Sequence, residues 1–198
     1  MSGTAAMKIE SFSLFRENPS NLKELSKDTS EQDNIKYMTH SKLPAVNFDD
    51  VKTAHVNNLG LTEELATSVD ALVDFPDGHV FIEFKNGKMG NQKRKVKDKI
   101  RDSLLIFSEI TGKNIDYTRC NMDFILVYNI EKNPLPHQIE KNSVQESVSR
   151  NLIGSYLAKK GGKELILFDL ARFEKLYFRQ VHTYSQSEFE DFLKKYEK

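Results

Sequence analysis

The order of hydrophobic and polar residues predicts a β-hairpin near the middle of the chain, followed by a long helix. Residues 69–75 (VDALVDF) and 80–85 (VFIEFK) are rich in β-branched and aromatic residues, with the turn-forming sequence Pro76-Asp77-Gly78 between them. After residue 91, apolar residues recur every three or four positions, which predicts an amphipathic helix that ends at Gly112. This apolar face consists of Val96, Ile100, Leu104, Phe107 and Ile110.

The remaining pattern predicts helices and strands that alternate towards the C-terminus. Residues 8–35 suggest a helical or flexible arm, 36–60 an irregular segment, and Thr62 the start of a short helix. The further expected elements are a buried strand at 123–130, a helix at 143–159, strands at 164–170 and 175–184, and a last helix that starts with a capping box at Ser187. This order indicates an α/β fold in which helices pack on a mixed sheet.

The length of 198 residues indicates one domain at 36–198 with an N-terminal arm at 1–35, where residues 1–6 precede a start at Met7. The single cysteine, Cys120, excludes an internal disulfide and a cysteine-rich zinc site, and favours a reducing, cytoplasmic location. No apolar run approaches the roughly 20 residues that cross a membrane, and no secretory signal is visible at the N-terminus. We therefore expect no membrane association.

The charges of the chain balance, with 29 Lys and Arg against 29 Asp and Glu, but their distribution is uneven. Residues 85–101 contain eight basic residues and one acid, a net charge of +7. Lys93, Lys97 and Arg101 are spaced by four and share one helical face, so with Lys88 they could contact nucleic-acid phosphates. The alternative is an ordinary solvated helix face.

Two carboxylates and a lysine are expected to meet on the hairpin. Glu83 and Lys85 point to the same side of their strand, since strand residues alternate between faces. A turn centred near residues 77–78 places Asp70 beside them, whereas Asp74 lies near the hairpin tip and His79 in the turn. Two acids from neighbouring strands suit a hard cation such as Mg²⁺, and a lysine can position water or stabilise charge on a phosphate. The alternative is a cross-strand salt bridge on a solvated face.

The sequence from Asp70 through twelve residues to Glu83-Phe84-Lys85, between a short helix and a basic helix, resembles the PD-(D/E)xK nuclease superfamily. The resemblance covers about residues 60–130, with Val69 where the family name has proline. It implies a restriction-endonuclease-like fold with an αβββαβ core, Asp70 and Glu83 as ligands of Mg²⁺ or Mn²⁺, and Lys85 as the catalytic lysine. It also implies assistance from Glu63 or Glu64 on the first helix and from Gln92 on the helix after the lysine strand.

Three functions remain open on this reading. The first is a divalent-metal-dependent nuclease that acts on DNA or RNA, and that is expected to form a homodimer if it makes two cuts. The second is a catalytically inactive protein with the nuclease fold that binds nucleic acid or serves as a subunit of a nucleic-acid-processing complex. The third is a salt-bridged surface hairpin in a protein of unrelated function.

Overall fold

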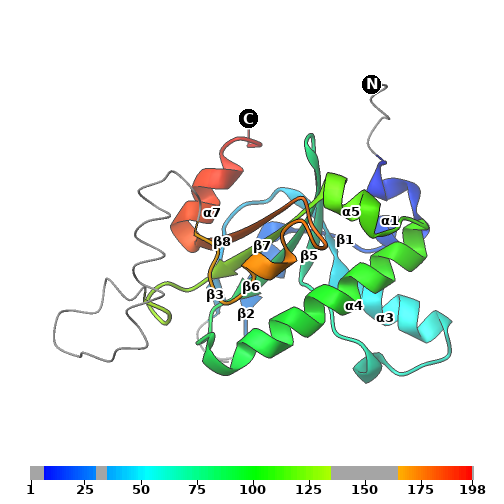
Figure 1. Cartoon of the computed structure of the whole chain (residues 1–198), viewed down its shortest axis with the longest axis horizontal. Coiled ribbons are helices and arrows are strands. Elements are labelled where there is room, and N and C mark those ends of the chain that lie inside the picture. Colours follow the sequence, from blue (N-terminus) through cyan, green and yellow to red (C-terminus); the bar gives the residue numbers. More distant parts are fainter. Residues whose placement is uncertain (1–6, 30–34, 135–164, 198) are drawn as a thin grey trace.

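The computed structural model describes residues 7–29, 35–134 and 165–197, and these form an α/β fold around a mixed six-stranded sheet (Figure 1). The strand order is β1-β4-β5-β6-β7-β8, and a separate ribbon pairs β2 with β3. Strands β1, β4, β5 and β6 pair antiparallel, whereas β6, β7 and β8 run parallel. The strands are β1 (Pro19–Asn21), β2 (Lys27–Asp28), β3 (Lys36–Tyr37), β4 (Pro44–Asn47), β5 (Ala71–Phe75), β6 (Gly78–Lys85), β7 (Met122–Tyr128) and β8 (Gln180–Ser185).

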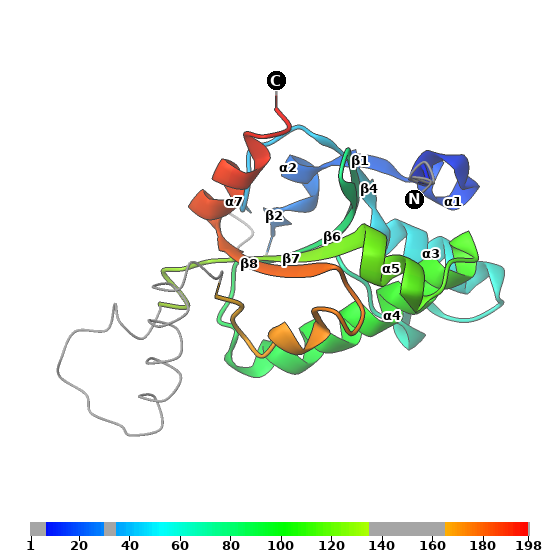
Figure 2. The same ribbon diagram turned by 45° about the horizontal axis from the view of Figure 1, so that its top comes forward.

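Helices cover both faces of this sheet, as Figure 2 shows. The helices are α1 (Ser13–Arg16), α2 (Leu22–Leu25), α3 (Phe48–Asn58), α4 (Lys93–Thr111), α5 (Ile115–Asn121) and α7 (Gln186–Leu193), with 3-10 turns η1 (Ile9–Ser11), η2 (Glu63–Leu65), η3 (Gly90–Gln92) and η5 (Ala171–Phe173). The first core cluster contains buried residues of α1, α3 and α4, and the second contains those of α2 and α7. No helix among the described residues is long and apolar enough to cross a lipid bilayer.

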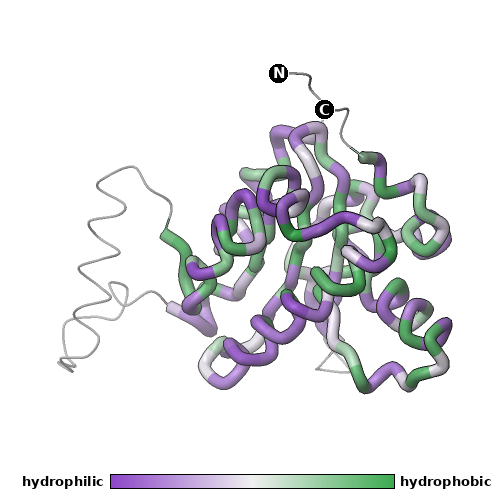
Figure 3. Tube along the Cα trace, turned by 45° about the vertical axis from the view of Figure 1, so that its right-hand side comes forward, coloured by the Kyte–Doolittle hydropathy of each residue, from purple (hydrophilic) through white to green (hydrophobic). Residues whose placement is uncertain are grey.

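Strand β6 contributes to both cores because its side chains alternate between the two faces. Phe81 joins the cluster under α3 and α4, whereas Ile82 and Phe84 join the cluster under α7. Figure 3 shows hydrophobic and hydrophilic residues interspersed along the helices, as expected for helices that pack one face on a sheet. Glu83 and Lys85 therefore lie on the face that α4 covers.

Several expected elements are confirmed. The hairpin is β5–β6, the buried strand at 123–130 is β7, and α4 ends at Gly112, which adopts a left-handed conformation with φ of 66°. Val96, Ile100, Leu104 and Phe107 of its expected apolar face are buried. The strand expected at 175–184 is shorter and lies at Gln180–Ser185.

Other expectations are wrong. The segment 36–60 is not irregular, since it contains β4 and α3; α3 begins after Asn47, whose side chain accepts hydrogen bonds from the backbone N–H groups of Asp49 and Asp50. The helix expected at Thr62 is only the 3-10 turn η2. Residues 165–170 form no strand, and the last helix is capped by Ser185 rather than Ser187. The helix expected at 143–159 lies outside the described residues.

The first part of the chain packs with the sheet. Strand β1 is an edge strand of the main sheet, paired with β4. Phe15 belongs to the core under α3 and α4, and Leu22 belongs to the core under α7. Residues 7–29, which we expected as a helical or flexible arm, thus contribute a strand and buried side chains to the fold.

The turn end of the hairpin is held by a chain of three polar side chains. His79 lies in β6 and is fully buried, rather than in the turn. Its ring nitrogens contact Asp74 on one side and the Tyr117 hydroxyl, at 2.7 Å, on the other. Asp74 is also not merely a residue of the hairpin tip, because it accepts a hydrogen bond from the backbone N–H of Ile9. This chain links β5, β6, α5 and the N-terminal segment.

Replacing Tyr117 with Phe is expected to lower the free energy of unfolding by about 1–3 kcal/mol, because the buried Nε2 atom of His79 loses its partner. Urea unfolding followed by circular dichroism measures the change. The control is Tyr177→Phe, since the Tyr177 hydroxyl makes no hydrogen bond to the described residues. Equal stabilities of the two variants would show that the His79 contact contributes nothing.

Candidate active site

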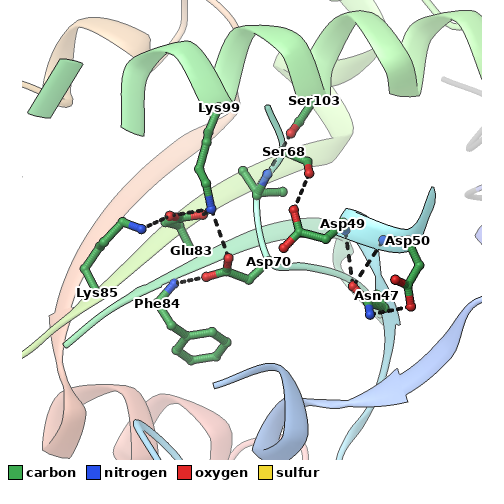
Figure 4. Close-up of polar contacts among 11 residues, drawn as sticks. Asn47, Asp49, Asp50, Ser68, Asp70, Glu83, Phe84, Lys85, Lys99 and Ser103 are labelled. Carbon is green, nitrogen blue, oxygen red and sulfur yellow. Dashed lines mark hydrogen bonds and ion pairs between the residues drawn. The ribbon is translucent and has the colours of Figure 1, made fainter. Parts of the chain in front are cut away.

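The register of the hairpin places Asp70 beside Glu83. Ala71 pairs with Ile82, and Phe75 pairs with Gly78, so Asp70, immediately before β5, lies across from Glu83. A turn centred near residues 77–78 would place Asp70 opposite residues 84–85, so the observed pairing is shifted by one to two residues, but it brings the same acids together. Figure 4 shows both carboxylates pointing towards Lys99 on α4. The sequence therefore predicted the pair of acids correctly, without predicting what lies between them.

Three hydrogen bonds fix Asp70 and the residue before it. Its Oδ2 atom accepts a 2.6 Å hydrogen bond from the N–H of Phe84, and its carbonyl accepts a bond from the N–H of Phe48 at the start of α3. The N–H of Val69 donates to the hydroxyl of Ser103 on α4. The carboxylate is thus fixed at the junction of β5, β6, α3 and α4, while its side chain remains 17% exposed.

Glu83 lies on the central strand β6 and is completely buried. Its Oε1 atom is 2.7 Å from the Nζ atom of Lys85, two residues along the same face, and 2.9 Å from the Nζ atom of Lys99. These contacts of Oε1 are ion pairs without hydrogen-bond geometry, whereas Oε2 accepts a 3.0 Å hydrogen bond from Lys99. A buried carboxylate of this kind is tolerated because two ammonium groups surround it.

Lys99 is the site residue that the sequence reasoning missed. Its Nζ atom lies 3.1 Å from Oδ1 of Asp70 as well as against Glu83, and its side chain is only 11% exposed. In the sequence, Lys99 is one of the eight basic residues of 85–101. The helical spacing indicates its burial, because Lys99 stands three residues after Val96 and four before Ser103. Both of these residues are buried, so Lys99 shares the buried face of α4.

The electrostatics of the site follow from burial and from the closeness of the charges. Burial, and then the nearby charge of Asp70, raises the pKa of Glu83 to about 7. Burial by itself would lower the pKa of Lys99, but Glu83, Asp70 and Asp49 together raise this pKa above its usual value. Lys99 is consequently an ammonium ion at neutral pH.

The resemblance implies an acid from the helix before the hairpin. That helix is α3, and the acid that it brings near the site is Asp49 rather than Glu63 or Glu64. Asp49 lies in the first turn of α3 and accepts a hydrogen bond from the hydroxyl of Ser68, two residues before Asp70 (Figure 4). Glu63 and Glu64 lie in the exposed turn η2, where Glu63 contacts Lys52 and Thr53 of α3. Because the sequence pattern of 36–60 predicts no helix, it does not indicate α3 or the position of Asp49.

The predicted auxiliary residue Gln92 is exposed at the N-cap of α4. The predicted row of basic residues, Lys93, Lys97 and Arg101, lies on another side of this helix from Lys99. Lys93 and Lys97 form ion pairs with Asp169, and Arg101 forms one with Asp98. Lys97 and Lys99 are separated by about 200° around the helix axis at 3.6 residues per turn. Lys88 is exposed in the loop before α4.

A pocket of about 310 Å³ adjoins the acids where β6 ends. Asp70, Phe84 and Lys85 line this pocket, and Lys27 and Lys132 add two exposed cations to its lining. Asn86 also lines the pocket, is buried, donates to Asp28 and accepts from Asn129. The pocket therefore gives solvent access to Asp70 and Lys85, although Glu83 itself is buried.

Comparisons with known proteins assign no family to this chain, because no family model, curated protein or solved structure matches it. Within the described residues, no three or more His, Cys, Asp or Glu side chains gather as a metal site. The interpretation of the site therefore depends on its own geometry. That geometry consists of two carboxylates from neighbouring strands, which share one cation, with a second lysine in contact with Glu83.

Proposed function

We propose that this protein is a divalent-metal-dependent nuclease that hydrolyses phosphodiester bonds of DNA or RNA. The observation that carries the proposal is the convergence of Asp70 and Glu83 on a single cationic group, the Nζ atom of Lys99, at 2.9–3.1 Å. Lys85 lies 2.7 Å from Glu83 and lines the adjoining pocket. The spacing of these three residues is the one that resembles the PD-(D/E)xK superfamily.

The residues present fit Mg²⁺ or Mn²⁺. Carboxylate oxygens are the donors that these hard cations prefer, and Mg²⁺ commonly takes only one or two carboxylates while it keeps several waters. Two carboxylates therefore suffice. The Oε1 atom of Glu83 is buried without a hydrogen bond and has only ion-pair partners, so it can accept a cation without losing a hydrogen bond.

The roles of the side chains follow from their positions. A bound divalent cation supplies charge stabilisation at the phosphate and lowers the pKa of water. Asp70 and Glu83 would hold this cation, and the hydrogen bond from the N–H of Phe84 orients the Asp70 carboxylate. Lys85 pairs with Glu83 and lines the pocket. Its ammonium group would donate a hydrogen bond to the attacking water or stabilise the charge that develops on the phosphate.

The connectivity around the site supports the restriction-endonuclease-like class with one departure. The order β5–β6–α4–β7, with β7 parallel to β6, agrees with the ββαβ part that ends an αβββαβ core. Between α3 and α4, however, the chain has two strands rather than three, and the neighbouring strand β4 precedes α3. The acids nonetheless occupy the neighbouring strands that the resemblance implies.

The test is a cleavage assay with labelled single-stranded and double-stranded DNA and RNA in the presence of Mg²⁺, Mn²⁺ or a chelator. Cleavage that requires the metal supports the proposal, and the preferred substrate identifies the nucleic acid. Gel-filtration with light scattering on the same protein tests whether it forms the homodimer that two cuts would favour. Absence of metal-dependent cleavage on every substrate would refute the proposed activity.

A second candidate function is a catalytically inactive protein of the same fold that binds nucleic acid or serves in a nucleic-acid-processing complex. The observation that favours it is Lys99, since its ammonium group occupies the place between the acids where a metal would bind. Salt-dependent nucleic-acid binding without metal-dependent cleavage would support this alternative. In that case, Asp70, Glu83 and Lys99 form a buried ion-pair network with a structural role.

Charge reversal in the pocket tests where nucleic acid binds. The double variant Lys27→Glu, Lys132→Glu is expected to weaken binding and to make its salt dependence shallower by about two phosphate contacts, because these lysines flank Asp70 and Lys85. The matched variant Lys93→Glu, Lys97→Glu changes the same charge where Asp169 already pairs with both lysines, so a smaller effect is expected. Fluorescence anisotropy at several salt concentrations measures both. A larger effect of the second variant would place the interface on α4.

A further inference from the structure

We propose that Lys99 acts as an internal competitor for the divalent cation, so that a metal ion enters between Asp70 and Glu83 only when the Lys99 ammonium group leaves. This inference depends on the metal site of the proposed function. It assigns to a residue of α4 the control of metal affinity at that site.

The first argument is the position of the ammonium group. Lys99 Nζ lies 3.1 Å from Asp70 Oδ1, 2.9 Å from Glu83 Oε1 and 3.0 Å from Glu83 Oε2. It thus contacts the same carboxylate oxygens that would coordinate a metal. A cation bound to one oxygen of each acid would lie within a few ångströms of this nitrogen. The two cations cannot share this volume.

The second argument is the charge balance of the buried cluster. When both acids are ionised, Asp70 and Glu83 carry two negative charges, and Lys85 and Lys99 already neutralise them. A divalent cation added to this set would leave two excess positive charges in a site that is largely removed from water, where repulsion is only weakly screened. Departure of Lys99 removes one of these charges and frees the carboxylate oxygens at the same time.

The third argument is that the Lys99 side chain can move away from Asp70 and Glu83 to another carboxylate. Its side chain is long and flexible and belongs to α4. Glu83, by contrast, is fixed by its place in β6, and Asp70 is fixed by the hydrogen bond from the N–H of Phe84. Asp49 lies in the exposed first turn of α3 and accepts a hydrogen bond from the hydroxyl of Ser68, two residues before Asp70, so a further carboxylate stands beside the site. Asp49 therefore offers a partner for the displaced ammonium group.

The experiment compares the affinity of the metal-free protein for Mn²⁺ by calorimetry and by electron paramagnetic resonance. The Lys99→Met variant is expected to bind Mn²⁺ at least about tenfold more tightly than the wild type, since a competing charge has been removed. The control is Lys95→Met, an exposed position one turn earlier on α4, which is expected to bind as the wild type does. Equal or weaker binding by folded Lys99→Met would overturn the proposal.

Thermal unfolding provides a second measurement, because Lys99→Met leaves the buried Glu83 and the partly buried Asp70 without their shared partner. Its melting temperature is expected to be low without metal and to rise more with Mn²⁺ than that of the wild type. If the variant does not fold, the wild type is followed by nitrogen-15 NMR of its lysine ammonium groups during a Mg²⁺ titration. Displacement of the protected Lys99 signal supports the proposal, whereas an unchanged signal or no metal binding overturns it.

The outcomes separate this inference from the proposed nuclease activity. Tighter metal binding by Lys99→Met in a protein that cleaves no nucleic acid supports the competition and refutes the activity. Metal-dependent cleavage by the wild type, with the same Mn²⁺ affinity for wild type and Lys99→Met, supports the activity and refutes the competition.

Discussion

Replacing Glu83 with Gln is expected to lower the rate of metal-dependent cleavage by at least about 10²-fold, and Asp70→Asn and Lys85→Met are expected to have effects of similar size. Gln keeps the volume of the buried side chain but removes the charge that faces Lys85 and Lys99. Asn at position 70 can still accept the hydrogen bond from Phe84 N–H, so its effect reports the lost charge rather than a lost fold. Single-turnover cleavage rates, with Mg²⁺ and with Mn²⁺, measure the change.

The matched control for this prediction is Glu64→Gln, which makes the same chemical change in the exposed turn η2. It is expected to leave the cleavage rate unchanged. Circular dichroism and melting temperature establish that each variant is folded before its rate is interpreted. Equal activity of the wild type and all three site variants would show that cleavage, if observed, takes place elsewhere in the protein.

The stability of the metal-free protein is expected to depend on pH through Glu83. Burial raises the pKa of this carboxyl in the folded protein from 4.5 to about 7, so the folded state binds the proton more tightly than the unfolded state does. The contribution of Glu83 to stability is therefore fully present below pH 4.5 and is lost as the pH rises through about 7. Relative to Glu83→Gln, which cannot titrate, the wild type should lose about 3 kcal/mol across this window.

Urea unfolding of the wild type and Glu83→Gln, in a chelator and at a series of pH values, measures this difference. Glu64→Gln again serves as the control, because the pKa of exposed Glu64 is lowered by its own backbone N–H and by Thr62. Its contribution has the opposite sign, since it is present at higher pH and is lost on acidification. Parallel pH profiles for the wild type and Glu83→Gln would contradict the expected coupling.

The elements that could be predicted from the sequence are those whose signals are local. The hairpin followed from β-branched strands around Pro76-Asp77-Gly78, and α4 followed from the spacing of Val96, Ile100 and Leu104 and from Gly112. The closeness of Asp70 and Glu83 followed from hairpin geometry, with a register that differs by one to two residues from the observed one. Helix α3 was missed although Asn47 and two following acids form a recognisable helix start.

The chain by itself therefore determined the pair of acids and the lysine on the hairpin, because antiparallel strands joined by a tight turn have few registers. Only the tertiary structure decided the rest of the site. It placed Lys99 between Asp70 and Glu83, brought Asp49 close, and set Lys93 and Lys97 against Asp169. The reason is physical: the direction in which a charged helix residue points depends on how the helix packs on the sheet, and a buried carboxylate draws the cation that packing brings within reach.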